Sequence, residues 1–275
     1  MAGYCLRMAA PAGASDFLFR VTTCKPGSIR ALIEAIKDIL GDANIEFTPS
    51  GISIKRMDGM NTILVVLNLH ASKFEEYYCP EPVVVGVNMH NFHKLIKTVG
   101  NSSNIVLYMR KSKRTQIGID FQSLVTKATT HFLMDSTELD VEHVSIPPID
   151  YTSVLTMPSV EFQKIIRDMR TIGDEVEIQS ASSELSFRCK GEFAEQETIF
   201  EFGTNGITQA KPSSCEIVQM TYSLKNLILF TKCTPLCTDI TIYLRNLHPI
   251  VIEYDVSGLG KIMLALSPSK IPVTY

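Results

Sequence analysis

The stretch SVEFQKIIRDMRTIG, residues 159–173, carries the clearest structural signal in the chain. Its apolar residues recur at intervals of three and four: Phe162, Ile165, Ile166, Met169 and Ile172. This spacing predicts an amphipathic helix that buries one face. Ser159 is expected to cap the start of the helix, and Gly173 to end it.

The same helical pattern occurs three more times, in SIRALIEAIKDI (28–39), NMHNFHKLIKTV (88–99) and YSLKNLILFTKC (222–233). The expected N-cap residues of these helices are Ser28, Asn88 and Ser223. Each helix is followed by two to four short strand-like runs. The order helix, strands, helix, strands occurs once before residue 135 and once after residue 152, which predicts two homologous halves.

Between the helices the sequence favours β-structure, as in GISIKRM (51–57), TILVVLNL (62–69) and PIVIEYDV (249–256). Such runs are short, β-branched and separated by turn residues at hairpin spacing. We therefore predict an α+β fold in which the helices pack on one face of antiparallel sheets. A chain of 275 residues also allows the alternative of one larger all-β domain.

Four segments divide the chain in this interpretation. Residues 1–17 are expected to form a poorly ordered N-terminal extension without a secretory signal, so the protein should stay inside the cell. Residues 18–134 form the first domain and residues 153–275 the second. Residues 135–152 show neither period and contain Pro147 and Pro148, which predicts an extended interdomain connector.

Composition and motifs argue against several classes of protein. No stretch of 18 apolar residues is present, so membrane insertion is not expected. Seven cysteines without a CxxC pair indicate reduced thiols. His90 and His93 lie one helical turn apart but lack a third ligand, and SGLGK (257–261) lacks the residues of a phosphate-binding loop. We expect no metal, no cofactor and no enzymatic activity.

The distribution of charge is more informative than its sum. A net charge of −3 by itself argues against a nucleic-acid-binding protein. The four helical segments, however, hold nine basic and four acidic residues, so their net charge is +5 and that of the rest of the chain is −8. The basic residues are Arg30, Lys37, Lys94, Lys97, Lys164, Arg167, Arg170, Lys225 and Lys232. One such helix would be an ordinary solvated face. Four of them favour a surface that binds DNA phosphates regardless of sequence.

Five motifs resemble the proliferating cell nuclear antigen family: MPSVEFQKIIRDMRTIGD (157–174), TYSLKNLILFTKCTPL (221–236), PIVIEYDVSGLGKIMLALSP (249–268), ALIEAIKDIL (31–40) and KRMDGMNTILVVL (55–67). The resemblance covers residues 18 to 270. It implies a DNA sliding clamp, a homotrimeric ring whose helices line a hole around double-stranded DNA. The nine basic residues would line that hole, although Arg170 stands where the family often has a neutral residue. Subunits would meet through two edge strands, residues 127–132 and 197–202.

The resemblance also implies a hydrophobic pocket beside the connector for peptides that carry a glutamine and aromatic residues. Its residues are Met57, Val144, Ile146, Pro147, Tyr151, Pro249, Ser267 and Pro268. The implied partners are DNA polymerase, the clamp loader and repair proteins, and the implied location is the nucleus or a viral replication compartment. The chain departs from the family pattern at three positions. Ala265 stands where the family commonly has an aromatic residue, Thr62 where it has an aliphatic one, and Ser182 where it often has a modifiable lysine. The alternative function is an adaptor of the same fold that acts in a heteromeric ring or without encircling DNA.

Overall fold

The computed structural model describes residues 16–140, 149–204, 206–211 and 217–269. One sheet lies at one end of the molecule and contains β1 (Phe17–Thr23), β5 (Glu76–Tyr78), β7 (Ser103–Arg110), β8 (Lys113–Ser123) and β9 (Thr129–Asp135). Its strand order is β5-β1-β7-β8-β9, which leaves β9 on an edge. At the opposite end lies a second sheet, made of β11 (Glu175–Ser180), β12 (Glu184–Lys190), β13 (Glu195–Glu201) and β15 (Val218–Ser223). Its order is β13-β12-β11-β15, so β13 is an edge strand too.

A nine-stranded sheet joins the two halves of the chain. From the first half it takes β2 (Asp42–Thr48), β3 (Gly51–Met57), β4 (Ile63–His70) and β6 (Val83–Asn88). From the second half it takes β10 (Ser153–Pro158), β14 (Thr208–Lys211), β16 (Asp239–Leu244), β17 (Ile250–Asp255) and β18 (Gly260–Leu266). The order is β14-β10-β16-β17-β18-β4-β3-β2-β6. The halves meet where β18 pairs with β4, in a register that runs from Gly260↔Leu69 to Leu266↔Ile63.

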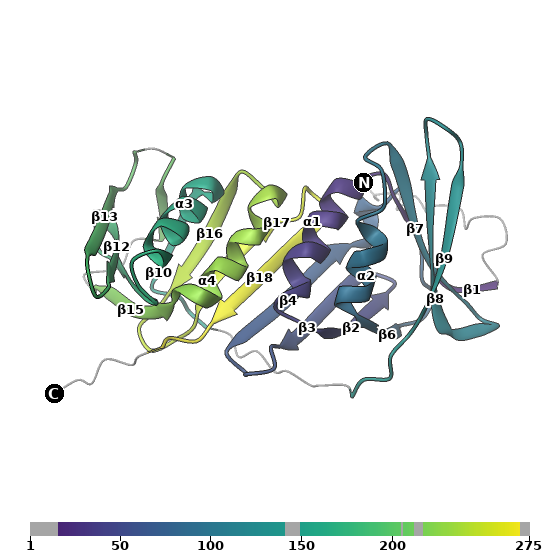
Figure 1. Cartoon of the computed structure of the whole chain (residues 1–275), viewed down its shortest axis with the longest axis horizontal. Coiled ribbons are helices and arrows are strands. Elements are labelled where there is room, and N and C mark those ends of the chain that lie inside the picture. Colours follow the sequence, from purple (N-terminus) through teal and green to yellow (C-terminus); the bar gives the residue numbers. More distant parts are fainter. Residues whose placement is uncertain (1–15, 141–148, 205, 212–216, 270–275) are drawn as a thin grey trace, which may run out of the picture.

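Four α-helices lie together on one face of these sheets (Figure 1). They are α1 (Pro26–Lys37), α2 (Met89–Ile96), α3 (Ser159–Arg170) and α4 (Leu224–Phe230), and α4 continues into the 3-10 helix η3 (Thr231–Leu236). Phe162, Ile166 and Met169 of α3 are fully buried. Every strand pair in the described residues is antiparallel. The predicted α+β fold with helices on one face of antiparallel sheets is confirmed.

Of the four predicted helix caps, two lie at the N-cap position and two do not. Asn88 caps α2, where its side-chain oxygen accepts a hydrogen bond from the Asn91 N–H at 3.0 Å. The helix predicted to begin at Ser28 begins instead at Pro26, because proline is well tolerated in the first turn. Ser159 is a helical residue rather than the cap, and its hydroxyl donates to the Cys237 carbonyl at 2.7 Å. Ser223 occupies the N-cap position of α4 but makes no capping hydrogen bond through its side chain.

No helix within the described residues is long and apolar enough to cross a membrane.

Candidate nucleic-acid interface and partner pocket

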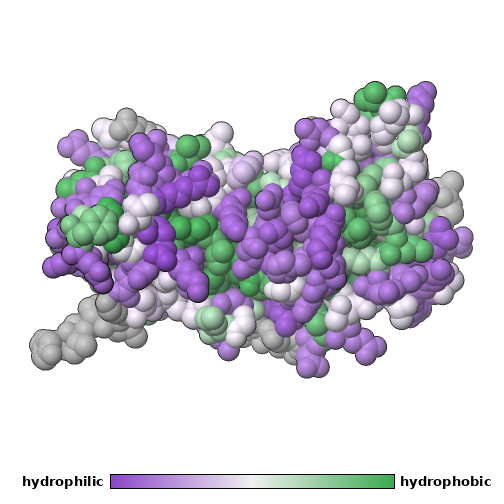
Figure 2. Space-filling view, in the orientation of Figure 1, coloured by the Kyte–Doolittle hydropathy of each residue, from purple (hydrophilic) through white to green (hydrophobic). Residues whose placement is uncertain are grey.

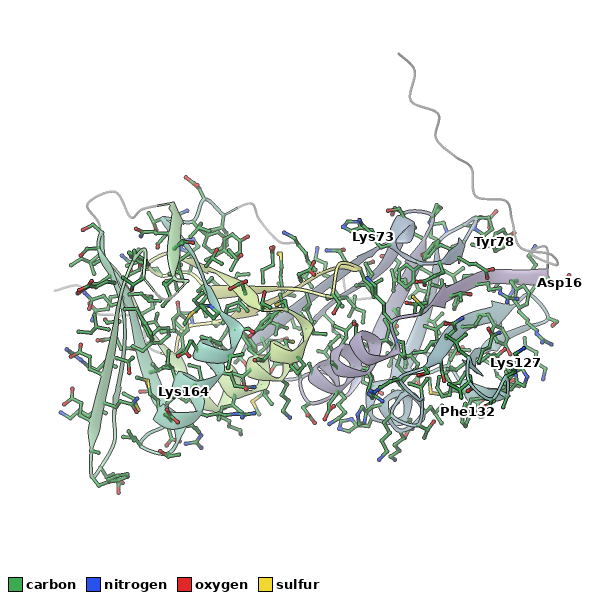
Figure 3. The ribbon with its side chains drawn as sticks, turned by 90° about the horizontal axis from the view of Figure 1, so that it is seen from above. Asp16, Lys73, Tyr78, Lys127, Phe132 and Lys164 are labelled. Carbon is green, nitrogen blue, oxygen red and sulfur yellow. The ribbon has the colours of Figure 1, made fainter. Side chains whose placement is uncertain are left out.

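All nine predicted basic residues lie on helices of the same face of the molecule. Their positions are Arg30 and Lys37 in α1, Lys94 in α2 with Lys97 at its C-cap, Lys164, Arg167 and Arg170 in α3, Lys225 in α4, and Lys232 in η3. Because each helix turns its apolar side toward the sheets, the basic side chains project from the opposite side. Figure 2 shows hydrophilic residues gathered over the central helices, and Figure 3 shows Lys164 on the side where the helices protrude.

Five of the nine cations are exposed and have no acidic partner among the described residues. They are Lys94, Lys97, Lys164, Arg167 and Lys225. Within the described part of the chain, none of these side chains lies within salt-bridge distance of a carboxylate. Lys94 Nζ donates a hydrogen bond to the Asn91 amide oxygen at 3.4 Å. These five charges are available to an anionic ligand without the loss of an existing ion pair.

Two arginines of the set are held by neighbouring residues. The Arg30 guanidinium donates to the Val99 carbonyl at 3.1 Å and to Asn101 Oδ1 at 2.6 Å, which ties α1 to the segment after α2. Arg170 donates to Asp174 Oδ1 at 2.5 Å and to the Gly173 carbonyl at 3.2 Å. Both remain on the helix face, but contact with a phosphate would compete with these hydrogen bonds.

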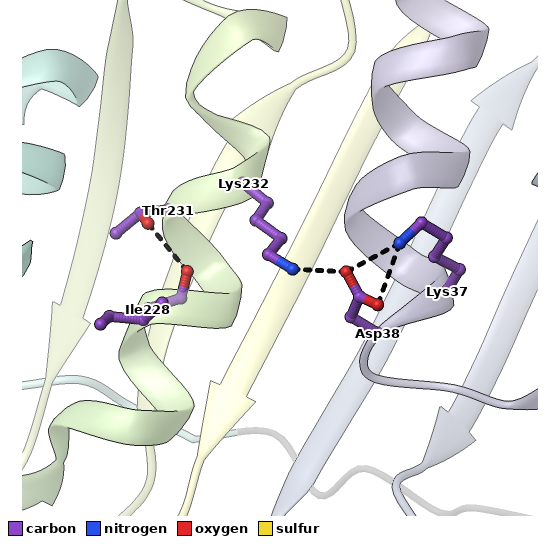
Figure 4. A network of polar contacts seen from close by, with 5 residues as sticks. All are labelled: Lys37, Asp38, Ile228, Thr231 and Lys232. Atoms are coloured by element: carbon purple, nitrogen blue, oxygen red, sulfur yellow. Dashed lines mark hydrogen bonds and ion pairs between the residues drawn. The ribbon is translucent and has the colours of Figure 1, made fainter. Parts of the chain in front are cut away.

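The last two cations share one carboxylate where α1 meets η3 (Figure 4). Lys37 Nζ lies 3.0 Å from both oxygens of Asp38, and Lys232 Nζ contacts Asp38 Oδ2 from the other half of the chain. Partial burial acts to raise the pKa of Asp38, but the hydrogen bonds from Lys232 and Lys37 outweigh burial and lower it. Asp38 is therefore ionised at neutral pH and offsets one of the two lysine charges.

The described members of the predicted pocket lie around the junction of the two halves. Met57 ends β3, Pro249 precedes β17, and Ser267 and Pro268 follow β18. The Ser267 N–H donates to the Thr62 carbonyl at 3.0 Å, and the Tyr151 ring packs against Tyr243 at a centroid distance of 5.4 Å. Three other predicted residues lie outside the described residues: Val144, Ile146 and Pro147.

A row of cross-strand neighbours runs across the nine-stranded sheet from Met57 to Tyr243, the residue that packs against Tyr151. The register pairs Tyr243 with Val251, Val251 with Ala265, Ala265 with Leu64 and Leu64 with Met57. Alternation along each strand places this row on the face away from the helices. The resemblance did not name Leu64, Val251 and Tyr243 as pocket residues, and only the register assigns them to this surface. Ala265, in the middle of the row, leaves more room than the aromatic residue common in the family.

Thr62, which stands where the family has an aliphatic residue, makes two hydrogen bonds in the turn between β3 and β4. The Thr62 hydroxyl donates to Asp58 Oδ2 at 3.1 Å, and its N–H donates to Asp58 Oδ1 at 2.7 Å. The polar side chain therefore stabilises the turn between β3 and β4.

Both halves of the chain match models of one protein family. The model of the proliferating cell nuclear antigen N-terminal domain matches residues 22–143, and that of its C-terminal domain matches residues 145–269. The chain belongs to this family. It is also similar to a protein of Paramecium bursaria Chlorella virus 1 described as "Probable DNA polymerase sliding clamp 1". The two are 31% identical over 257 residues, which cover 92% of this chain and 97% of the viral protein.

This member of the proliferating cell nuclear antigen family has an unpaired edge strand at each end (Figure 1). The predicted contact segments, residues 127–132 and 197–202, overlap β9 and β13. Leu133 on β9 and Ile199 on β13 are 54% and 53% exposed, which is unusual for aliphatic residues of a strand. Strand edges with exposed apolar residues favour pairing with another chain.

Other candidate sites carry less signal. No group of three or more metal-binding side chains occurs among the described residues. Burial and the nearby Lys37 charge lower the pKa of His93, so this helix histidine is neutral at pH 7. The five cysteines in the described ranges are free thiols: Cys24, Cys79, Cys189, Cys233 and Cys237.

Proposed function

We propose that the protein is a DNA sliding clamp, a homotrimeric ring that encircles double-stranded DNA and acts as a processivity factor without enzymatic activity of its own. One observation carries the proposal: nine cations gather on the helix face of a family member whose net charge is −3. In a ring that turns this face inward, the cations would surround the duplex. The acidic remainder of the chain would face outward.

The proposed interface binds phosphates and reads no bases. Lysine and arginine neutralise phosphates and release counterions, so the binding is independent of sequence and weakens steeply with salt. Lys94, Lys97, Lys164, Arg167 and Lys225 are proposed as the main contacts, because none of them must give up a carboxylate. Arg30, Lys37, Arg170 and Lys232 are proposed as secondary contacts, because each already makes hydrogen bonds within the protein.

The surface away from the helices is proposed to recruit partner proteins. Its described residues Met57, Tyr151, Pro249, Ser267 and Pro268 would bind peptides with a glutamine and aromatic residues, together with Val144, Ile146 and Pro147 of the connector. DNA polymerase, the clamp loader and repair proteins are the proposed partners. The proposed division into residues 18–134, a connector 135–152 and residues 153–275 places this pocket between the domains. The proposed location is the nucleus or a viral replication compartment.

Two measurements test the function. Light scattering of the purified protein should give a mass near three times 30.6 kDa. Protein loaded onto a nicked circular plasmid by a clamp loader should stay bound after gel filtration and be lost when the plasmid is linearised, because a ring slides off free ends. A stable monomer, or retention that does not depend on circularity, would favour the adaptor.

A further inference from the structure

The hairpin between β7 and β8 is a strongly basic surface outside the proposed DNA interface. Residues 110–114, RKSKR, hold four cations in five positions, and all four side chains are exposed. Among the described residues no carboxylate lies within salt-bridge distance of Arg110, Lys111, Lys113 or Arg114. The Arg110 guanidinium lies 5.7 Å from the Tyr108 ring centroid, and that contact leaves its charge uncompensated. We call residues 110–114 the basic hairpin.

An oppositely charged hairpin lies at the other end of the molecule. The turn between β12 and β13 and the start of β13 contain Glu192, Glu195 and Glu197, all exposed. Arg188 lies 3.8 Å from Glu195 and 2.9 Å from Glu197, and the exposed Lys190 is opposite Glu195 in the register. Glu192 has no cation within salt-bridge distance in the described part of the chain and supplies the uncompensated charge. We call residues 192–197 the acidic hairpin.

Each hairpin sits next to an unpaired edge strand. β9 ends at Asp135, which is opposite Gln116 of β8, and the Ser136 N–H donates to the Thr115 carbonyl at 2.8 Å. Lys113 precedes Gln116 by three residues, so the basic hairpin extends about 10 Å past the end of β9. Glu192 precedes the first residue of β13 by three residues as well. The two charged hairpins therefore overhang their edge strands by similar lengths.

The basic hairpin lies at the end of the molecule that carries β9. The Lys111 N–H donates to the Asp16 carbonyl at 2.9 Å. Figure 3 shows Asp16, Lys127 and Phe132 together at this end, far from Lys164. The basic hairpin of one chain therefore cannot reach the acidic hairpin of the same chain.

We propose that the basic hairpin of one subunit binds the acidic hairpin of the next, forming an electrostatic clasp beside the paired edge strands. The proposal rests on the proposed ring. An antiparallel pairing of β9 with β13 places the start of β13 beside the end of β9. The two hairpins then lie about two strand spacings apart, roughly 10 Å, which extended Lys or Arg and Glu side chains can span. A parallel pairing would instead bring Glu201 of β13 and its cross-strand neighbour Glu184 to the basic hairpin, so the clasp applies to the antiparallel arrangement.

The test compares charge reversals on each hairpin with their combination. Lys113→Glu/Arg114→Glu and Glu192→Lys/Glu195→Lys should each raise the protein concentration at which trimers dissociate by about tenfold at low salt. The loss should shrink near 0.5 M salt, where the Debye length falls to about 4 Å. The variant with all four changes restores opposite charges across the interface and should recover wild-type assembly. Sedimentation at several protein concentrations measures the dissociation midpoint, the concentration at which half of the trimers have dissociated.

The control reverses the same amount of charge elsewhere. Lys55 and Lys73 are exposed and lie on β3 and in the turn after β4, away from both hairpins. Lys55→Glu/Lys73→Glu should leave the dissociation midpoint unchanged. If the wild type is a trimer but the dissociation midpoint shifts no more in the hairpin variants than in this control, the proposed clasp is wrong and the proposed ring is unaffected. Failure of the four-change variant to recover would overturn it too. A monomeric wild type would overturn the ring itself.

Discussion

Replacing Asp38 with asparagine should tighten DNA binding, although Asp38 is itself unable to bind a phosphate. In the folded protein the carboxylate accepts hydrogen bonds from Lys37 and Lys232, so neither ammonium group is free (Figure 4). Asp38→Asn keeps the size of the side chain and removes its charge. Two lysines per subunit would then become available to the duplex.

The magnitude follows from counterion release. Each additional phosphate contact steepens the dependence of the logarithm of the binding constant on the logarithm of salt concentration by about 0.9. For each subunit that contacts the duplex, two contacts add about 1.8, so the loss of affinity between about 50 and 200 mM salt should grow by roughly tenfold per contacting subunit. Fluorescence anisotropy of a labelled linear duplex, titrated at several salt concentrations, measures this slope.

A matched variant separates the release of lysines from a general change in charge. Asp168 is exposed on α3, and its carboxylate has no cation within salt-bridge distance in the described part of the chain. Asp168→Asn removes one negative charge from the same helix face and frees no lysine. If Asp38→Asn and Asp168→Asn give the same salt slope, the reasoning about Lys37 and Lys232 is wrong.

The same substitution has a stability cost with a defined pH range. Because the folded-state pKa of Asp38 is lowered, its ion pairs stabilise the protein above the unfolded pKa of about 3.9 and lose this effect as the pH falls through the folded pKa. The carboxylate is 25% exposed, so the contribution should be under about 1 kcal/mol. The melting temperatures of the wild type and Asp38→Asn should therefore differ at pH 7 and converge toward pH 3.

Three further outcomes are expected. Lys94→Glu/Arg167→Glu should reduce polymerase processivity and make the salt slope of DNA binding shallower by about 1.8 for each subunit that contacts the duplex. The Lys55→Glu/Lys73→Glu control should keep the wild-type processivity and slope, and equal slopes in the two variants would remove Lys94 and Arg167 from the interface. Met57→Ala/Leu64→Ala should weaken the binding of a peptide with a glutamine and aromatic residues by about tenfold, or about 1.4 kcal/mol, in calorimetric titrations. Unchanged affinity would show that the peptide binds elsewhere. Asn88→Ala should cost about 1 kcal/mol of unfolding free energy in urea, since it removes the α2 cap, and no loss would show the cap to be dispensable.

The sequence was sufficient for the features that depend on local periodicity. Helical spacing in residues 159–172 identified the buried face of α3, and the same spacing placed basic side chains on the opposite side of each helix. Helix starts were harder to predict. Ser28 and Ser159 have the chemistry of capping residues, but Pro26 starts α1 earlier and the Ser159 hydroxyl binds the Cys237 carbonyl.

Features that depend on contacts between distant residues could not be predicted. Nothing near Asp38 in the sequence indicates that Lys232, 194 positions away, contacts the same carboxylate as Lys37. The pocket row is similar: Leu64, Ala265 and Val251 become neighbours only through the register of three strands. A fixed alternation along each strand indicates which residues share a face, but not which strands lie side by side.

The pairing of β18 with β4 also constrains how the chain can be made. In the finished protein β4 is an interior strand, held on one side by residues 260–266. During synthesis those residues emerge from the ribosome long after β4, so the N-terminal half waits with an open, strongly apolar strand until residues 260–266 have been made. An exposed edge of this kind is prone to aggregate or to pair with the wrong chain. The nascent protein should therefore depend on chaperones until β18 has been made.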